Sequence, residues 1–347
     1  MKLYTQQGQL IQYTKQFWLG GSFGSPTGSP ARESLFNVVL SKYLPDQHVI
    51  LKLDHGENIQ DLTHPVIENY SDHSLNLYYQ NNNYITLTSA FNFKKYNNRT
   101  TPYYKTKNIV YFPFWLFFSR YAQEDDVYGF PDTRRYSVSC LNRNVRGQRM
   151  YLLTKLSHQE YFKDMFITVG DIVGSSTDVE ISADIVQEFS KVYETLPKVE
   201  MNMMNEYYHC ARIYEPGWGN SYLNIVTEPS IDDAGFLSEK IFKPIRAEQL
   251  FLIQGCPGTV SYLKSIGFDV FDDYIDHSRY DNEPNWQRRT DLMLAVLDEI
   301  YPSIERIFAE TKQRRLANRL YLQSDKLENL LLKELLECID LYVPPVL

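Results

Sequence analysis

Apolar and polar residues alternate between residues 220 and 271 in the pattern of a doubly wound α/β domain. The predicted order is strand, loop, helix, strand, glycine turn, helix and strand, with the last strand at residues 268–271. Open parallel sheets bind ligands beyond the carboxyl ends of their strands. Glu239 and Lys240 follow the first strand of this segment, so a binding site is expected there.

The first part of the chain contains one clear strand, at residues 49–53. Apolar residues at helical spacing predict a helix before it, over residues 31–43. A long apolar run at residues 109–118 is interrupted by Pro113 and predicts a core strand followed by a helix or turn.

The later part of the chain begins with a predicted strand at residues 136–141 and a helix at residues 148–156. A helix over residues 289–310 is expected to break or kink at Pro302. A final amphipathic helix is predicted over residues 317–342.

The length of 347 residues suits two domains rather than one. Polar residues, glycine and proline between residues 122 and 135 are typical of a crossing between domains. We therefore expect an α/β protein with two Rossmann-like lobes facing a cleft, at residues 1–130 and 131–316, and a C-terminal helical segment at residues 317–347.

The composition indicates a folded protein, because 43% of the residues are hydrophobic and 22% are charged. A net charge of −8 argues against a protein that coats nucleic acid. The start of the chain lacks a signal-peptide pattern, and no apolar run approaches the length of about 18 residues that a membrane span needs. These features predict a cytoplasmic protein without membrane insertion. The 4 cysteines form no Cys-x-x-Cys pair, so neither a zinc site nor a disulfide framework is indicated.

A group of 5 arginines lies close together in the sequence, at Arg134, Arg135, Arg143, Arg146 and Arg149. A basic focus in an acidic protein favours a phosphate-bearing ligand. Asn142 and Arg146 lie in the loop before the helix, and Arg149 would project from the first turn of that helix beside its amides. The alternative is a set of surface arginines.

Ser238, Glu239 and Lys240 have a structural explanation of their own. Ser238 can cap a helix, and Glu239 suits the positive end of the helix. Their joint occurrence with the arginines at strand ends favours a nucleotide diphosphate instead. Such a ligand needs a cation for its phosphates and a carboxylate for its ribose hydroxyls.

These segments resemble fucosyltransferase-like GT-B glycosyltransferases. In that family an Asn is followed by an Arg and a Tyr/Leu-rich helix, as at Asn142 and Arg149. The sequence LNIVTE at residues 223–228, followed by Ser-Glu-Lys at residues 238–240, is similar to the family's donor signature. The whole block looks closer still to uncharacterised glycosyltransferases of large DNA phages. The donor-binding residues that follow from the loop and the resemblance are Asn142, Arg146, Arg149, Glu228, Ser238, Glu239 and Lys240. The resemblance implies that Arg149 and Lys240 bind the diphosphate, that Glu239 binds ribose, and that Glu228 acts nearby.

No Asp-x-Asp triplet occurs in the sequence, so a metal-bridged diphosphate site is not indicated. A cationic clamp performs the same electrostatic task, and we predict an enzyme without metal or cofactor whose donor substrate is a nucleotide-sugar. Transfer with inversion needs a general base from the first lobe. Asp54, His55 and Glu57 follow the strand at residues 49–53 and are the candidates, with an ordinary polar turn as the alternative.

The resemblance implies transfer of a sugar to an acceptor hydroxyl, on a glycan or on a modified base of phage DNA such as 5-hydroxymethylcytosine. The acidic net charge favours a glycan, whereas the phage-like appearance favours DNA and the host cytoplasm. A flipped base would need a basic rim, for which Lys94, Lys95 and Arg99 are the candidates, although they also suit a solvated loop. A nucleotide- or glycan-binding module without catalysis is the alternative from another class.

Overall fold

A computed structural model describes two parts of the chain to different extents. In the first part it describes the backbone of five short strands and the position of Leu116. Beyond these, the described residues are 130–142, 145–170, 179–198, 213, 218–229, 231, 235 and 237–331. Contacts divide the chain into one unit of residues 1–122 with 328–347 and a second unit of residues 123–327.

The first unit contains two small sheets. Strands β1 (Leu3–Tyr4) and β2 (Leu10–Ile11) pair in antiparallel fashion. Strands β3 (Ile50–Asp54), β4 (Tyr84–Thr88) and β5 (Ile109–Tyr111) form a parallel sheet in that order. The strands predicted at residues 49–53 and near residue 109 are therefore confirmed. The helix predicted over residues 31–43 lies outside the described residues.

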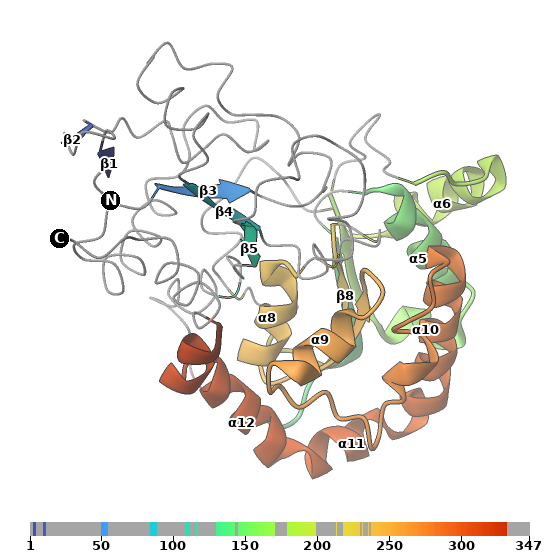
Figure 1. Cartoon of the computed structure of the whole chain (residues 1–347). Helices are drawn as coiled ribbons and strands as arrows, with labels where there is room; N and C mark the ends of the chain where they lie inside the picture. Colours follow the sequence, from blue (N-terminus) through green and yellow to red (C-terminus); the bar gives the residue numbers. More distant parts are fainter. Residues whose placement is uncertain are drawn as a thin grey trace. The chain divides into compact units, whose positions relative to one another are not determined.

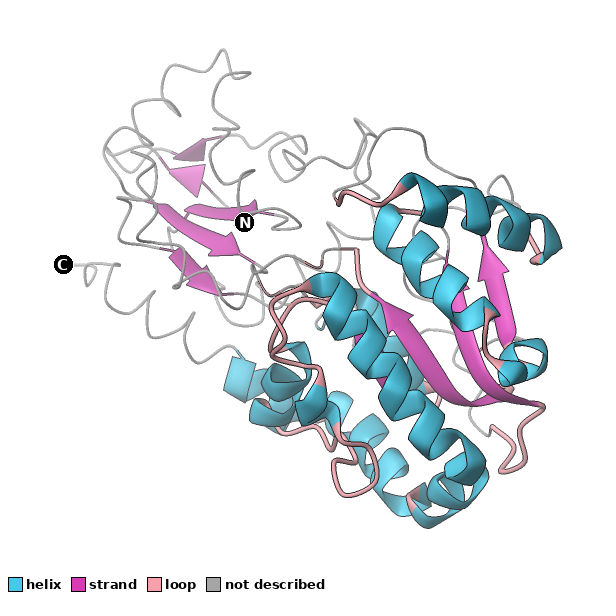
Figure 2. Ribbon diagram, turned by 90° about the vertical axis from the view of Figure 1, so that its right-hand side faces the viewer, coloured by secondary structure: helices cyan, strands magenta, loops and turns pink. Residues whose placement is uncertain are grey.

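The second unit is built on a parallel sheet of four strands in the order β7-β6-β8-β9. The strands are β6 (Tyr136–Asn142), β7 (Phe166–Val169), β8 (Ser221–Thr227) and β9 (Leu250–Gln254). Every residue of β8 and β9 is buried, as expected where helices cover both faces of a sheet. Figure 2 shows the strands as neighbouring arrows with helices packed around them.

The direction of the crossovers reverses between β6 and β8. The chain leaves β6 through helix α5 (Gly147–Ser157) and continues to β7, on one side of β6. It leaves β8 through helix α8 (Glu239–Arg246) and continues to β9, on the other side. Because such crossovers are right-handed, α5 and α8 lie on opposite faces of the sheet. The carboxyl ends of β6 and β8 thus meet at a topological switch point, where open α/β sheets bind ligands.

The second unit contains further helices, several of which pack around this sheet (Figure 1). They are α6 (Ala183–Thr195), α9 (Thr259–Ser265), α10 (Trp286–Ile300), α11 (Ile304–Glu310) and α12 (Lys312–Leu322), with the short 3-10 helices Glu160–Asp164, His277–Arg279 and Tyr301–Ser303. Helix α10 packs on α5 and β9, and α12 packs on α8. The break predicted at Pro302 is confirmed, since Pro302 lies in the 3-10 turn between α10 and α11.

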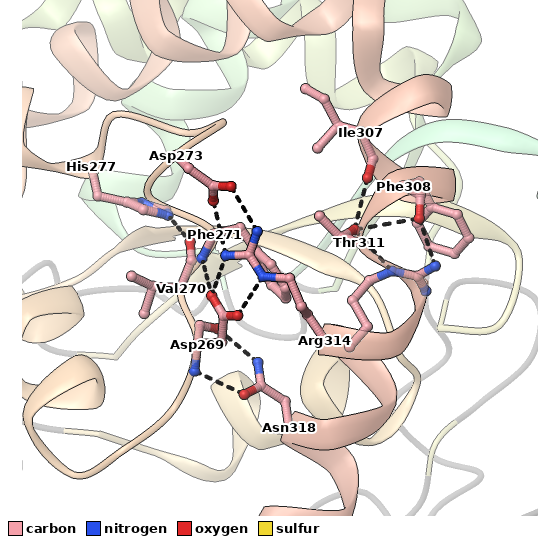
Figure 3. Close-up of polar contacts among 11 residues, drawn as sticks. Asp269, Val270, Phe271, Asp273, His277, Ile307, Phe308, Thr311, Arg314 and Asn318 are labelled. Carbon is pink, nitrogen blue, oxygen red and sulfur yellow. Dashed lines mark hydrogen bonds and ion pairs between the residues drawn. The ribbon is translucent and has the colours of Figure 1, made fainter.

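The strand predicted at residues 268–271 is wrong. Phe268, Val270 and Phe271 are buried, but this segment is irregular and Phe271 has a positive φ of 60°. The side chain of Asn318 in α12 forms the backbone hydrogen bonds that a neighbouring strand would otherwise form. Its side chain accepts the Asp269 amide at 2.8 Å and donates to the Asp269 carbonyl at 2.7 Å (Figure 3).

Arg314 fixes α12 to the same segment. Its guanidinium lies between Asp269 and Asp273 and donates two hydrogen bonds to each carboxylate (Figure 3). The final helix was predicted as one piece over residues 317–342, and that prediction is also wrong. Helix α12 begins at Lys312 and ends at Leu322, and a second helical stretch at residues 325–331 follows a break.

Candidate functional site

The two central strands are joined at their carboxyl ends by side chains. The Asn142 side-chain oxygen accepts a hydrogen bond from the Thr227 hydroxyl at 2.8 Å, and its amide donates to the Cys140 sulfur at 3.3 Å. Asn142 and Thr227 are both buried. Asn142 therefore lies where the sequence predicted it, at the switch point, and its polar groups bind other protein groups there.

Glu228 follows β8 directly and is fully buried. Both of its carboxylate oxygens accept the Ser238 amide, each at 3.2 Å. Burial raises the pKa of Glu228 to about 7, although the charge of Lys240 and the hydrogen bonds from Ser238 act in the opposite direction. A Cβ at Gly255 would lie 3.4 Å from the Glu228 Cγ, so the turn after β9 packs closely against this side chain.

The predicted cap of α8 is confirmed. The Ser238 hydroxyl accepts the Lys240 amide at 3.2 Å. The Lys240 ammonium lies 3.0 Å from a Glu239 oxygen, and these side chains are 29% and 9% exposed. Burial alone would raise the pKa of Glu239, but Lys240 and Lys243 outweigh it and lower that pKa. Burial likewise disfavours the charge of Lys240, yet Glu239 and Glu228 outweigh it and raise the pKa of Lys240.

Arg149 projects from the first turn of α5 and is 4% exposed. Its Nη2 donates to the Thr227 carbonyl at 3.0 Å. Burial, helped by the charge of Arg146, lowers the pKa of Arg149 to about 10, whereas Glu228 and Glu239 act to raise it. The positive charge of Arg149 also acts to lower the pKa of Lys240. The structure therefore brings together two cations and two carboxylates from α5, α8 and the end of β8.

Arg146 precedes α5 and reaches across to the loop after β8. Its Nη1 donates to the Pro229 carbonyl at 2.8 Å, and the Gln148 amide donates to the same carbonyl at 3.2 Å. Arg146 thus lies at the predicted edge, where it holds the loop that carries Glu228.

The prediction that the arginines form one basic focus is wrong for Arg134. Its guanidinium donates to the carbonyls of Gly219 and Ala247 and packs on aromatic rings at the amino end of β6. Asn142 lies at the opposite end of β6, a strand of 7 residues. A strand of that length spans roughly 20 Å. Arg135, also before β6, is exposed beside the Tyr136 ring, and Arg143 lies outside the described residues.

The predicted catalytic and acceptor residues belong to the first unit. Asp54 is the last residue of β3, at the carboxyl end of a parallel strand, but its side chain is not described. The other candidates lie outside the described residues and stay predictions: His55, Glu57, Lys94, Lys95 and Arg99.

Sequence reasoning missed several buried polar residues at this edge. Gln254, the last residue of β9, donates to the Gln148 carbonyl and to the Thr290 hydroxyl, both at 3.0 Å. A polar residue that ends an apolar strand was the available signal. Arg289 is buried in the first turn of α10, one helical turn before buried Met293. Its place on the apolar face of that helix was a signal that could have been used.

At the same edge, the backbone amides at the start of α9 are hydrogen-bonded to another side chain of the chain. The Asp281 carboxylate accepts the amides of Val260 and Ser261 at 2.8 and 2.9 Å. Within the described part of the chain, no three His, Cys, Asp or Glu side chains gather as metal ligands would. The same residues contain no helix with the length and apolarity that a membrane span requires.

No family model matches the sequence, and no curated protein matches it. Among solved structures, the chain is similar to a mutant of S. aureus TarM in complex with fondaparinux, α-GlcNAc-glycerol and UDP. The identity is 10%, the match covers 88% of this chain and 59% of that chain, and the TM-score is 0.39. The chain thus spans less than two thirds of TarM. It is also similar to T4 phage BGT in complex with UDP and Mn²⁺, at 10% identity, 81% and 74% coverage and a TM-score of 0.36.

A third similar structure is the DNA modifying enzyme β-glucosyltransferase, described in the presence and absence of its substrate uridine diphosphoglucose. The identity is again 10%, the match covers 87% of this chain and 94% of that chain, and the TM-score is 0.35.

Proposed function

We propose that this chain is a glycosyltransferase that binds a nucleotide-sugar at the carboxyl ends of β6 and β8 and transfers the sugar to an acceptor hydroxyl. The observation that carries the proposal is the cluster of buried Arg149, Glu228 and Glu239 with partly exposed Lys240 at the switch point. Burying charges costs several kcal/mol per ion, so a cluster of this kind is an expensive way to stabilise a fold. Clusters with shifted pKa values are typical of functional sites.

The charges suit the parts of a nucleotide-sugar. Arg149 and Lys240 would face the diphosphate, and Glu239 would accept hydrogen bonds from the ribose hydroxyls. Glu228 and Ser238 set the start of α8, where Lys240 lies, and Asn142 and Arg146 hold the neighbouring strand and loop. These roles agree with those that the resemblance to fucosyltransferase-like GT-B enzymes implies. In the proposed enzyme residues 131–316 bind the donor and residues 1–130 bind the acceptor.

In the proposed reaction the bond between the sugar C1 and the diphosphate oxygen breaks, and a bond from C1 to the acceptor oxygen forms. The electron pair of the broken bond leaves with the diphosphate, whose charge Arg149 and Lys240 stabilise. The acceptor proton passes to a general base, for which we propose Asp54, His55 or Glu57. Because Arg149 and Lys240 would neutralise the charge of the leaving diphosphate, we expect transfer without a metal ion.

The first experiment is a panel of UDP, GDP, CMP and their nucleotide-sugars, read by the shift in thermal unfolding temperature. One nucleotide class should raise the midpoint. Sugar transfer from the matching donor is then measured in EDTA, with glycans in one arm and duplex DNA containing 5-hydroxymethylcytosine in the other. Binding without transfer or hydrolysis would indicate the non-catalytic module, and a panel without any shift would refute the donor site.

Two substitutions test the residues. Arg149→Ala and Lys240→Ala should each weaken nucleotide binding by about 1.5 to 3 kcal/mol, the value of a hydrogen bond to a charged group. Lys312→Ala is the matched control, because Lys312, the first residue of α12, forms an exposed ion pair with Asp132. Unchanged nucleotide affinity in folded Arg149 and Lys240 variants would remove both residues from the donor site.

A further inference from the structure

Arg289 joins three separate loops with one side chain. Its Nε donates to the Gly255 carbonyl at 3.0 Å, and its Nη2 donates to the Ile231 carbonyl at 2.8 Å. Its Nη1 donates to the Glu283 carbonyl. Gly255 follows β9, Ile231 lies between β8 and α8, and Glu283 precedes α10. The guanidinium is buried at 3% exposure, so it is part of the interior of this unit.

Two of these loops adjoin Glu228, which belongs to the proposed donor site. The segment that contains Ile231 begins at Glu228 and ends at Ser238, whose amide Glu228 accepts. Gly255 packs against the Glu228 side chain. The same segment is held from the α5 side, because Arg146 and Gln148 both donate to the Pro229 carbonyl. Arg289 holds it from the α10 side.

We propose that Arg289 is a positioning residue of the donor site, which sets the loop between β8 and α8 so that Glu239 and Lys240 face Arg149. This inference rests on the proposed function. Arg289 acts through the loop and is not assigned a contact with the substrate. Its planar fork serves several carbonyls at fixed angles, which a lysine ammonium cannot do from one point.

The chain offers a matched control in Arg315 of α12. Arg315 is also 3% exposed, and its guanidinium donates to the Phe308 carbonyl at 2.8 Å and to the Thr311 hydroxyl at 3.3 Å. It also donates to the Glu248 carbonyl, which lies before β9, at the amino end of the sheet. Arg289 and Arg315 are therefore buried guanidinium groups that bind backbone carbonyls at opposite ends of the same strand.

The experiment compares Arg289→Lys and Arg289→Met with Arg315→Lys and Arg315→Met in the full chain. Thermal unfolding is measured first, and nucleotide-sugar affinity is measured at a temperature where all four variants are folded. All four should unfold at lower temperature. Only the Arg289 variants should lose nucleotide-sugar affinity, by tenfold or more, with a raised KM for the donor and an unchanged KM for the acceptor. Arg289→Lys should lose less than Arg289→Met, because it keeps the charge and one donor group.

Hydrogen exchange of the amides at residues 228–240 gives a readout that needs no ligand. Exchange there should be faster in Arg289→Lys than in Arg315→Lys. Equal exchange, or equal nucleotide affinity in the two pairs of variants, would overturn the positioning role while the donor site stands. A wild-type chain that binds none of the nucleotide-sugars would instead remove the proposed function, and this inference with it.

Discussion

Replacing Glu228 by Gln should make the chain more stable above neutral pH while damaging the proposed site. Glu228 is fully buried, and its pKa is raised from the ordinary 4.5 to about 7. Below pH 4.5 the carboxyl is protonated in the folded and unfolded chain alike. Between pH 4.5 and about 7 the unfolded chain loses this proton and the folded chain keeps it, so stability falls as pH rises.

The size of the effect follows from the shift in pKa. Each pH unit between the two values is worth about 1.4 kcal/mol, so a rise from 4.5 to about 7 amounts to roughly 3 kcal/mol. Glutamine does not titrate and has nearly the same shape as the protonated acid. The difference in unfolding free energy between Glu228→Gln and wild type should therefore rise by roughly 3 kcal/mol in favour of the variant from pH 4.5 to 7.5.

Urea unfolding at pH 5, 6, 7 and 8 measures this difference directly. Glu299→Gln removes an exposed carboxylate that is paired with Arg279 and controls for the loss of a negative charge. A difference between Glu228→Gln and wild type that stays constant over this range would refute the reasoning. A difference that changes in the opposite direction would mean that Lys240 and Ser238, rather than burial, dominate the pKa of Glu228.

Two further substitutions test how the unit is held together. Gly267→Ala should cost about 1 to 3 kcal/mol in urea unfolding, because Gly267 has a φ of 98° and an added Cβ would lie 2.7 Å from the Tyr321 hydroxyl; if Ala is tolerated without loss, the packing of α12 against this turn is not as described. Asp281→Ala should cost about 2 kcal/mol, because it leaves the Val260 and Ser261 amides at the start of α9 without their acceptor. An unchanged unfolding midpoint for Asp281→Ala would show that this carboxylate does not cap α9.

Strands β8 and β9 were predicted because burial on both faces leaves a direct trace in the sequence, whereas β7 was not predicted. Every residue of β8 and β9 is buried. In the sequence β9 begins with an apolar run, and β8 is apolar except at Ser221, Asn224 and Thr227. Apolar residues at 268–271 gave a wrong prediction of a strand, because their side chains are buried without a partner strand. The group that replaces the strand, Asn318, is 49 residues away from Asp269, and no local pattern identifies it.

The chemistry of the candidate site was predictable in part for a similar reason. Ser238, Glu239 and Lys240 lie next to one another after a strong strand, so their types and position can be read together. Buried arginines leave a weaker signal, which for Arg289 is only its place on the apolar face of α10. Arg134 and Arg289 both donate to backbone carbonyls, which every residue possesses, and one lies at the amino end of the sheet while the other lies at the carboxyl end.

A crystal structure of the chain with a bound nucleoside diphosphate or nucleotide-sugar tests the account most directly. The diphosphate should lie at the carboxyl ends of β6 and β8, with its oxygens about 2.7 to 2.9 Å from nitrogens of Arg149 and Lys240. A nucleotide bound elsewhere, or Arg149 and Lys240 both turned away from it, would contradict the donor site on which the proposed function depends.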